Sequence, residues 1–369
     1  MEIYMQMDMH YYAVFFLAAA AGMKISAAHT VANCSQFVDD SDSYDLVSFS
    51  DGSSCAASVT AHHTLSVKNL DVVDQRFIWV PFHFLPGGTG ESIEEKLVCA
   101  KDSFIVRMML DEVLSAENIK SSDFISRVGI SAHVLADTFS HSGFSGISSD
   151  LNRVVSSSID MEITDMSVKK EFLRQNNKFF RRNGIIKSFI REIIERIQGK
   201  LAESVTKALG HGSVATCPDV PYLRWKFKYE KPEREVCRNN PQEYRQACEA
   251  LYLFFCECCS LNPEITENAG IPYQNLLREI ESNTAYEGDC EKRSGKWMKS
   301  ALNMPNRFLN GTVPEYKGEV WKKCGVKSGY ADAANEADRK EAASFHRAAE
   351  AHRKFILRSV LPAAGIRIV

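Results

Sequence analysis

The stretch 122–141 constrains this chain most strongly, because it combines the apolar period of a buried helix with a regular row of polar side chains. His133, Asp137 and His141 are each four residues apart. Four residues advance an α-helix by about 400°, so these side chains form one ridge that drifts by only about 40° per step. Apolar residues occupy most positions between them: Val134, Leu135, Ala136 and Phe139. The sequence therefore predicts a helix that presents a polar ridge to a largely buried interior.

The ridge has the composition of a metal site. Imidazole and carboxylate groups are ordinary ligands of zinc and similar divalent ions, and a carboxylate has two oxygens with which to bridge a pair of ions. We predict that His133, Asp137 and His141 bind metal, with Asp137 and His141 as the candidate catalytic residues. The competing interpretation is that the three side chains only hydrogen-bond one another in the core, as buried polar groups commonly do.

Further candidate ligands lie at the ends of predicted elements, and eight of the ten histidines precede residue 212. We predict these additional metal ligands: Asp8, His10, Asp39, Asp40, His62, His83 and His211. Asp8 and His10 would point to the same side if the backbone there is extended. Asp39 and Asp40 follow a helix, where acidic charge needs a compensating partner such as a cation. The simpler interpretations are that Asp8 and His10 lie in a polar tail and that Asp39 and Asp40 lie in a solvated turn. A histidine such as His83 would then be a hydrogen-bonded core residue. The expected cofactor is zinc, as two or three ions, with manganese, iron or magnesium as alternatives.

Hydrophobic periodicity predicts a mainly α fold: a helical bundle with a small β-hairpin region and a helical C-terminal extension. The expected helices are 11–21, 27–38, 93–114, 122–141, 168–209, 243–260, 273–282 and 331–360. Short runs rich in Val, Ser, Thr and aromatic residues predict hairpins within 44–84. The polar stretch 226–244 resembles a linker. We therefore expect a metal-binding helical catalytic domain at 1–226 and a helical extension at 227–369.

The composition of the chain limits the classes of function that we expect for it. A length of 369 residues with 45% hydrophobic and 25% charged residues is ordinary for a globular protein. A net charge of -3 and a pI near 6.4 give no global footprint for nucleic-acid binding, which stays a secondary expectation. Eleven irregularly spaced cysteines predict free thiols in a reducing compartment, the cytoplasm. The apolar run 13–21 is too short to span a bilayer and lacks a positive flank, so we expect a buried helix rather than a signal peptide or transmembrane segment.

Several motifs together resemble an uncharacterised bacterial family of unknown function, over roughly 5–226. They are 7–12 (MDMHYY), 35–40 (SQFVDD), 81–86 (PFHFLP), 133–146, 210–212 (GHG) and 218–225. The His-x-x-x-Asp element that starts at His133, with a histidine four residues later, is more distantly similar to the zinc-dependent phospholipase C and S1/P1 nuclease group. That group has a helical fold with a three-zinc cluster that cleaves phosphoesters. The resemblance implies that His133, Asp137 and His141 are zinc ligands, with Asp137 as a bridge.

This chain also departs from that group. The group uses a processed N-terminal tryptophan as a ligand, which this chain lacks, and its closing His-x-x-x-Glu motif does not appear near residue 141. His346 and Glu350 have that spacing, but their charged, Ala-rich surroundings predict a solvated helix face. A second helical group, the HD-type phosphohydrolases, requires a His-Asp dipeptide, which the sequence does not contain.

These observations lead to the hypothesis of a metal-dependent phosphoesterase, in which the metal lowers the pKa of a bound water and the resulting hydroxide attacks in line. The expected substrates are a small phosphoester, a lipid headgroup or a nucleotide, and homo-oligomerisation remains open. The alternatives are a non-enzymatic protein that uses metal to staple its helices and an HD-like nucleotide phosphohydrolase. Structural zinc is coordinatively closed, whereas catalytic zinc keeps an exchangeable position.

Overall fold

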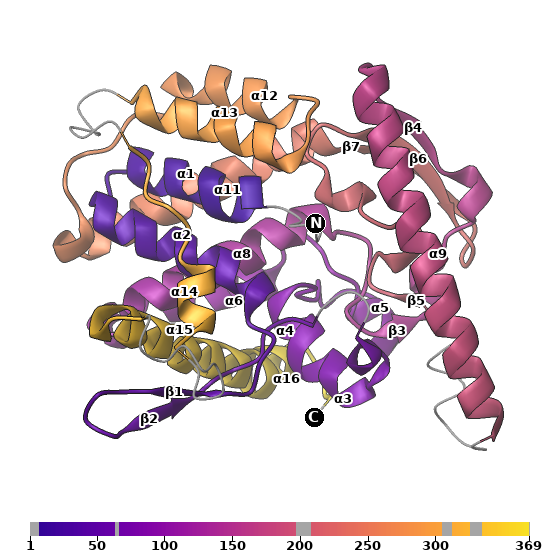
Figure 1. The fold of residues 1–369 in the computed structure, drawn as a ribbon, viewed down its shortest axis with the longest axis horizontal. Helices are drawn as coiled ribbons and strands as arrows, with labels where there is room; N and C mark the ends of the chain where they lie inside the picture. The colour runs from indigo at the N-terminus through magenta and orange to yellow at the C-terminus, as the bar shows by residue number, and fades with distance from the viewer. Residues whose placement is uncertain (1–6, 63–65, 197–207, 305–311, 325–333, 369) are drawn as a thin grey trace.

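The computed structural model describes residues 7–62, 66–196, 208–304, 312–324 and 334–368, and over these residues the chain is mainly helical (Figure 1). The predicted fold class is confirmed. The longer helices are α1 (Val14–Ala20), α2 (Ile25–Asp40), α6 (Phe104–Val113), α8 (Phe124–Ser140), α9 (Met166–Arg196), α11 (Asn240–Leu261), α12 (Leu277–Thr284), α13 (Cys290–Leu302) and α15 (Glu336–Phe355). The shorter ones are α3 (Val72–Asp74), α4 (Val80–Phe82), α5 (Ile93–Lys96), α7 (Ala116–Ile119), α14 (Gly318–Lys322) and α16 (Leu361–Ala363).

Short π-helical and 3-10 segments connect these helices. The π-helical segments are η1 (Met7–Ala13), η3 (Gln75–Trp79) and η11 (Ile356–Val360). The 3-10 turns are η2 (Val67–Leu70), η4 (Asp150–Asn152), η5 (Ser156–Ser158), η6 (Gly212–Val214), η7 (Cys217–Asp219), η8 (Pro263–Ile265) and η9 (Tyr273–Asn275). Two of these segments, η1 and η7, carry side chains of the candidate site described below.

Helix α8 contains the predicted polar ridge and packs against α2, α6, α11 and α15. The contact with α2 is close because α8 has a glycine at the crossing. A Cβ atom on Gly129 would lie 2.5 Å from Cβ of Cys34 and 2.5 Å from the carbonyl oxygen of Val31. The sequence thereby brings the end of α2, with Asp39, against the ridge of α8.

The two ends of the chain share one apolar core. Every residue of α1 is buried, and this helix packs against α2 and α11, while η1 packs against α13. One buried cluster contains side chains from both halves of the sequence, including Phe16, Val134, Phe255, Trp297 and Val360. Contacts between α15 and α8 also join the predicted catalytic domain, 1–226, to the predicted helical extension, 227–369.

The small β-hairpin predicted near the N-terminal third exists but is shorter than expected. Strands β1 (Leu46–Ser48) and β2 (Ser54–Ala56) pair antiparallel, with Leu46 opposite Ala56. The strands expected farther along were wrong, because η2, α3, η3 and α4 make the described part of 67–82 helical. Short apolar runs fit a strand and a buried helix turn equally well, so their pattern alone could not separate the two.

The stretch predicted as a linker instead forms a hairpin. Strands β6 (Arg224–Tyr229) and β7 (Arg234–Asn239) pair antiparallel, and β4 (Asp160–Glu162) adds to the other edge of β6. The side chains of Trp225, Phe227 and Tyr229 alternate with polar ones and are buried. Strands β3 (Ser148–Ser149) and β5 (Ala208–Leu209) form a separate pair. Helix α13 was not predicted, and it follows this hairpin and α11 and α12 along the chain.

Membrane insertion through a helix was not expected from the sequence. Among the described residues, no helix combines the length and the apolar character needed to cross a bilayer.

Candidate metal centre

The polar ridge of α8 is buried and its side chains are close together. Oδ2 of Asp137 lies 3.2 Å from Nε2 of His133 and 3.5 Å from Nδ1 of His141. His133 is fully buried, and Asp137 and His141 are nearly so. Because the spacing of four residues keeps these groups on one side of the helix, a single element supplies three candidate ligands.

Asp137 is the hub at which two more histidines meet the ridge. Its Oδ1 atom lies 3.2 Å from Nε2 of His10, which comes from η1. Its Oδ2 atom lies 3.2 Å from Nδ1 of His83, the residue that follows α4. The ring of His10 stacks on that of His133, with centroids 4.0 Å apart. Both carboxylate oxygens of Asp137 therefore face imidazole nitrogens from three separate parts of the chain.

Asp39 completes this side of the cluster. Its Oδ1 atom lies 3.8 Å from Nδ1 of His83 and 3.8 Å from Nε2 of His133. The Asp39 side chain is 31% exposed, whereas that of Asp137 is 2% exposed. Asp39 thus lies where solvent reaches the cluster.

A second group surrounds Asp219, the last residue of η7. Oδ1 of Asp219 lies 3.2 Å from Nε2 of His141, and its Oδ2 lies 3.5 Å from Nε2 of His211. Phe84 stacks on the ring of His141, with centroids 4.6 Å apart, and so packs one face of that ligand. His141 therefore connects the carboxylate of the ridge with a second carboxylate from a distant turn.

Three of these histidines have their tautomer fixed by a backbone carbonyl. Nε2 of His83 lies 2.9 Å from the carbonyl oxygen of Thr60, and Nδ1 of His141 lies 2.7 Å from that of His83. Nδ1 of His211 lies 2.7 Å from the carbonyl oxygen of Ala215. A carbonyl oxygen only accepts, so each of these ring nitrogens must carry the hydrogen. In each case the other nitrogen faces the cluster, and in a neutral ring it offers a lone pair, which is the usual arrangement of a metal-bound histidine.

This arrangement is not a self-sufficient hydrogen-bond network. With its hydrogen on Nε2, a neutral His83 offers only a lone pair at Nδ1, yet that atom lies 3.2 Å from Oδ2 of Asp137, which also only accepts. Acceptors placed against acceptors repel one another unless a second proton or a cation lies between them. The same holds for a neutral His211 against Asp219. The donor set therefore fits a bound divalent cation.

Burial determines which of these rings carries a second proton. It lowers the pKa of His133 to about 3, with help from the nearby His10. Burial also lowers the pKa of His211. Burial acts in the same direction on His141, but the carboxylates of Asp137 and Asp219 outweigh it and raise the pKa of His141 to about 9. His133 and His211 are therefore neutral at pH 7, which is the form that binds metal.

Three sets of ligand atoms are mutually close enough to hold an ion. They are His10, Asp39 and His133; His83, His133 and Asp137; and His141, His211 and Asp219. Within each set the ligand atoms lie within 4.8 Å of one another. Of the residues predicted as metal ligands, His10, Asp39, His83, His133, Asp137, His141 and His211 are thus brought together.

The structure places the other predicted ligands in different environments. Asp8 accepts two hydrogen bonds from Arg293, at 2.7 and 3.0 Å. Asp40 accepts one from the hydroxyl of Tyr316 at 2.6 Å. Nε2 of His62 lies 2.9 Å from Oδ2 of Asp74. None of these three predicted ligands belongs to the sets of clustered atoms found among the described residues.

Two further expectations need correction. Asp219 was not predicted as a ligand, because Gly212 and Pro218 interrupt any regular helix or strand that would relate its side chain to that of His211. His346 was expected on a solvated helix face, but it is 5% exposed and its Nδ1 accepts a hydrogen bond from the backbone of Ser58 at 3.1 Å. Only Glu350, its partner in the His-x-x-x-Glu spacing, is exposed.

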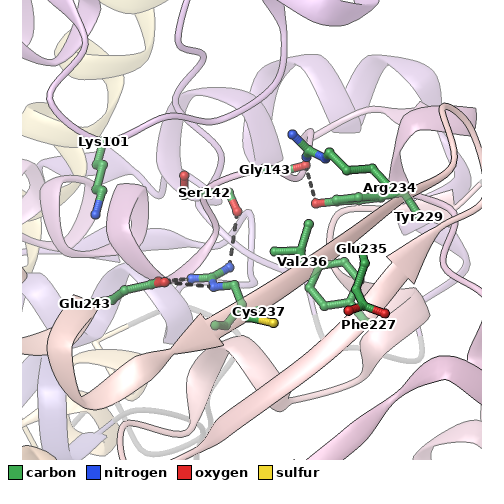
Figure 2. A pocket seen from close by; sticks show the side chains of 11 residues that line it. Lys101, Ser142, Gly143, Phe227, Tyr229, Arg234, Glu235, Val236, Cys237 and Glu243 are labelled. Carbon is green, nitrogen blue, oxygen red and sulfur yellow. Dashed lines mark hydrogen bonds and ion pairs between the residues drawn. The ribbon is translucent and has the colours of Figure 1, made fainter.

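A cavity of about 320 Å³ lies against the C-terminal end of α8, beside the hairpin of β6 and β7 (Figure 2). Arg238 lines it and donates hydrogen bonds to the carbonyl oxygens of Phe139, Ser140 and Ser142, at 3.0, 3.0 and 3.2 Å. Arg238 is also paired with Glu243. A cation at this position compensates the negative end of the helix dipole and satisfies carbonyls that the last turn leaves free. Arg238 therefore holds the end of the helix directly before His141.

Comparison with known proteins gives a family but no activity. No curated protein and no solved structure matches the chain. The profile of one family matches residues 5–360, which extends the resemblance from the first part of the chain through α15 and η11. The chain therefore belongs to the family described as "Family of unknown function (DUF6765)".

Proposed function

We propose that this protein is a metal-dependent hydrolase, with phosphoesters as its substrate class and zinc as its metal. The observation that carries the proposal is the orientation of His83, His141 and His211. Each ring donates its hydrogen to a backbone carbonyl and turns its other nitrogen toward a buried carboxylate. In its neutral form such a ring turns an unshared electron pair toward the carboxylate, and a cation between the two satisfies both groups, as in a metal-bound histidine held by a carbonyl.

A divalent cation bound in this cluster would act as a Lewis acid, lowering the pKa of a water molecule and polarising a phosphoryl oxygen. The chain's own residues supply the frame. Asp137 presents one oxygen to His10 and the other to His83 and His133, so it can bridge or orient ligands on both sides. The buried wall around the ridge excludes bulk water, and Asp39 lies at the exposed edge.

Phosphoesters are favoured over other hydrolysable groups for two reasons. The His-x-x-x-Asp spacing at His133 is similar to that of the phosphoester-cleaving zinc group, although only over this short motif. In addition, the His-Glu-x-x-His class of zinc-dependent amide hydrolases uses a glutamate as general base beside the metal. The clustered ligand sets found among the described residues consist of histidine and aspartate only. The substrate could be a small phosphoester, a lipid headgroup or a nucleotide.

The competing function is structural, with ions that only staple η1, α2 and α8 together. The set of His141, His211 and Asp219 favours the catalytic alternative, because three protein ligands leave a fourth position of zinc open, whereas a structural zinc site is coordinatively closed. All eleven cysteines are free thiols in the structure, which supports the reducing, cytoplasmic location that we propose.

The test is hydrolysis of bis(4-nitrophenyl) phosphate and 4-nitrophenyl phosphate by protein loaded with zinc, compared with chelated protein. We expect turnover that requires zinc and falls by at least about 100-fold in Asp137→Ala, since a bridging ligand is lost. Asp74→Asn is the matched control, because Asp74 pairs with His62 outside the cluster. Zinc binding without any turnover of either ester would favour the structural alternative.

A further inference from the structure

We propose that the cluster comprises two metal centres with different tasks, of which the one around Asp219 binds the anionic group of the substrate. This inference rests on the proposed function, because it assigns roles within the same cluster. The Asp137 centre contains His10, Asp39, His83, His133 and Asp137. The Asp219 centre contains His141, His211 and Asp219.

The first two ligand sets describe a single ion position. Both include His133, whose Nε2 atom lies 3.2 Å from Asp137 and 3.8 Å from Asp39 and so faces the carboxylates of both sets. One imidazole lone pair binds one ion. His10, Asp39 and His83 therefore surround the same ion as His133 and Asp137, and the Asp137 centre holds one cation.

The Asp219 centre is a separate position because of how His141 is oriented. The Nδ1 atom of His141 lies 3.5 Å from Asp137, but its hydrogen is donated to the carbonyl oxygen of His83 at 2.7 Å. Only Nε2 remains as a ligand, and it lies 3.2 Å from Asp219. His211 turns its Nε2 toward the same carboxylate. His141 thus belongs to the second ion although it stands on the ridge of the first.

The two centres differ in how many ligands the protein provides. The Asp137 centre has five candidate ligands, which is enough to close the coordination shell of zinc. The Asp219 centre has three, and three protein ligands with a fourth, exchangeable position are typical of catalytic zinc. An incoming oxygen atom from a phosphoester can therefore bind at the Asp219 centre without displacing a side chain.

Charge distinguishes the centres in the same direction. Asp39 and Asp137 supply two negative charges when both are deprotonated, as metal ligands must be, and one divalent ion neutralises them. Asp219 alone carries -1, so one divalent ion leaves its centre with a net charge of +1. An anionic phosphoester is attracted to a net positive centre and gains nothing from a neutral one.

Exposure agrees with this assignment. The accessible member of the Asp137 centre is the carboxylate of Asp39, with 31% of its side chain exposed, and it repels an approaching anion. The accessible member of the Asp219 centre is the imidazole of His211, with 15% of its side chain exposed. The partly exposed imidazole of His211 therefore suits an approaching phosphate group better than the carboxylate of Asp39 does.

The experiment measures zinc content and the binding of inorganic phosphate by the full chain. We expect two equivalents of zinc in the wild type and one in His211→Ala and in Asp219→Asn. Phosphate affinity, measured calorimetrically, should fall by at least roughly tenfold in both variants, because a protein ligand of the anion-binding ion is lost. Asp74→Asn is the control and should keep both ions and the phosphate affinity. His211→Ala is the more tolerant variant, since this side chain is partly exposed.

Each outcome bears on a different claim. Two ions and unchanged phosphate affinity in His211→Ala would overturn the assignment of the anion to the Asp219 centre. Loss of both ions from His211→Ala would overturn the division into two centres. A wild type that holds both ions but binds no phosphate would sink this inference and leave the metal site intact. A wild type that binds no zinc at all would remove the proposed function as well.

Discussion

Asp8 and Arg293 form a buried ion pair that joins η1 to helix α13, although 285 residues separate them in the sequence. The two contacts measure 2.7 and 3.0 Å, and the side chains are 2% and 8% exposed. Arg293 also donates to the carbonyl oxygen of Gly288 at 2.8 Å. Asp8 is two residues from the candidate ligand His10, whose Nδ1 atom has no hydrogen-bond partner among the residues that the structure describes. The ion pair therefore sets the position of η1, and with it the ring of His10.

Replacing Arg293 by methionine should destabilise the protein and weaken its hold on zinc. Loss of one partner leaves Asp8 buried and unpaired, so we expect the free energy of unfolding to fall by about 3–5 kcal/mol. The measurement is urea denaturation in the presence of chelator, followed by zinc titration at a temperature where the variant is folded. Arg245→Met is the matched control, because its ion pair with Glu281 is exposed and should be worth no more than about 1 kcal/mol. Equal losses in the two variants would contradict this role.

Gly129 should tolerate no larger side chain, because α2 and α8 touch there. An added Cβ would lie 2.5 Å from Cys34, so Gly129→Ala should cost about 1–3 kcal/mol of unfolding free energy and lower zinc affinity by separating Asp39 from His133. Gly295 in α13 is the control, since a Cβ added there would meet no heavy atom of another element within 4 Å. Gly295→Ala should raise stability by up to about 1 kcal/mol through helix propensity. Thermal denaturation of both variants measures these changes in stability. A Gly129→Ala variant as stable as the wild type would contradict the close contact between α2 and α8.

Two buried histidines of α15 should make the protein sensitive to acid. Burial lowers the pKa of His346 to about 4 and that of His352 to about 4. Their folded-state pKa is below the ordinary value of 6.5, so the unfolded chain takes up protons first and stability falls as the pH drops from 6.5 toward 4. Each shift corresponds to roughly 3 kcal/mol when fully expressed.

The check is the free energy of unfolding of chelated protein at pH 7 and pH 4.5. His352→Gln keeps a donor for the carbonyl oxygen of Pro81, to which Nε2 of His352 now donates at 2.9 Å, but it has no titrating group. We expect the loss of stability between the two pH values to be smaller in His352→Gln than in the wild type. The same loss in both proteins would show that this histidine does not carry the effect.

Metal removal should lower the melting temperature of the wild type. A ligand that binds only the folded state stabilises it by about 2.7 kcal/mol when its free concentration is 100 times Kd. We expect zinc to raise the melting temperature of chelated wild type and to do so much less in Asp137→Asn, which removes the charge of the hub. Differential scanning calorimetry measures this, and an equal zinc-dependent shift in both proteins would speak against Asp137 as a ligand.

The ridge of α8 could be predicted because the spacing of residues within one short stretch of sequence was enough to define it. His133, Asp137 and His141 share one helix, so their spacing of four residues was sufficient to place them on one side. His10, His83 and Asp219 reach the same place only through the packing of η1, α4 and η7. No period in the sequence encodes such contacts, which is why Asp219 was not predicted as a ligand.

Local backbone geometry also explains why two of the predicted ligands, Asp8 and Asp40, lie outside the cluster. Asp8 and His10 would share a side in an extended backbone, but η1 is helical, where two residues advance by about half a turn. His10 therefore faces Asp137 while Asp8 faces Arg293. Asp39 and Asp40 are both in α2, and successive helix residues differ by about 100°. Asp40 consequently points to Tyr316 instead of the cluster.

The most direct test of the metal centre is an anomalous difference map from crystals of the full chain grown with zinc, recorded on both sides of the zinc absorption edge. We expect a strong peak within coordination distance of His83, His133 and Asp137, with a second peak beside Asp219. If the crystals contain zinc but the map shows no peak at Asp137, the claim that this buried cluster binds metal is contradicted.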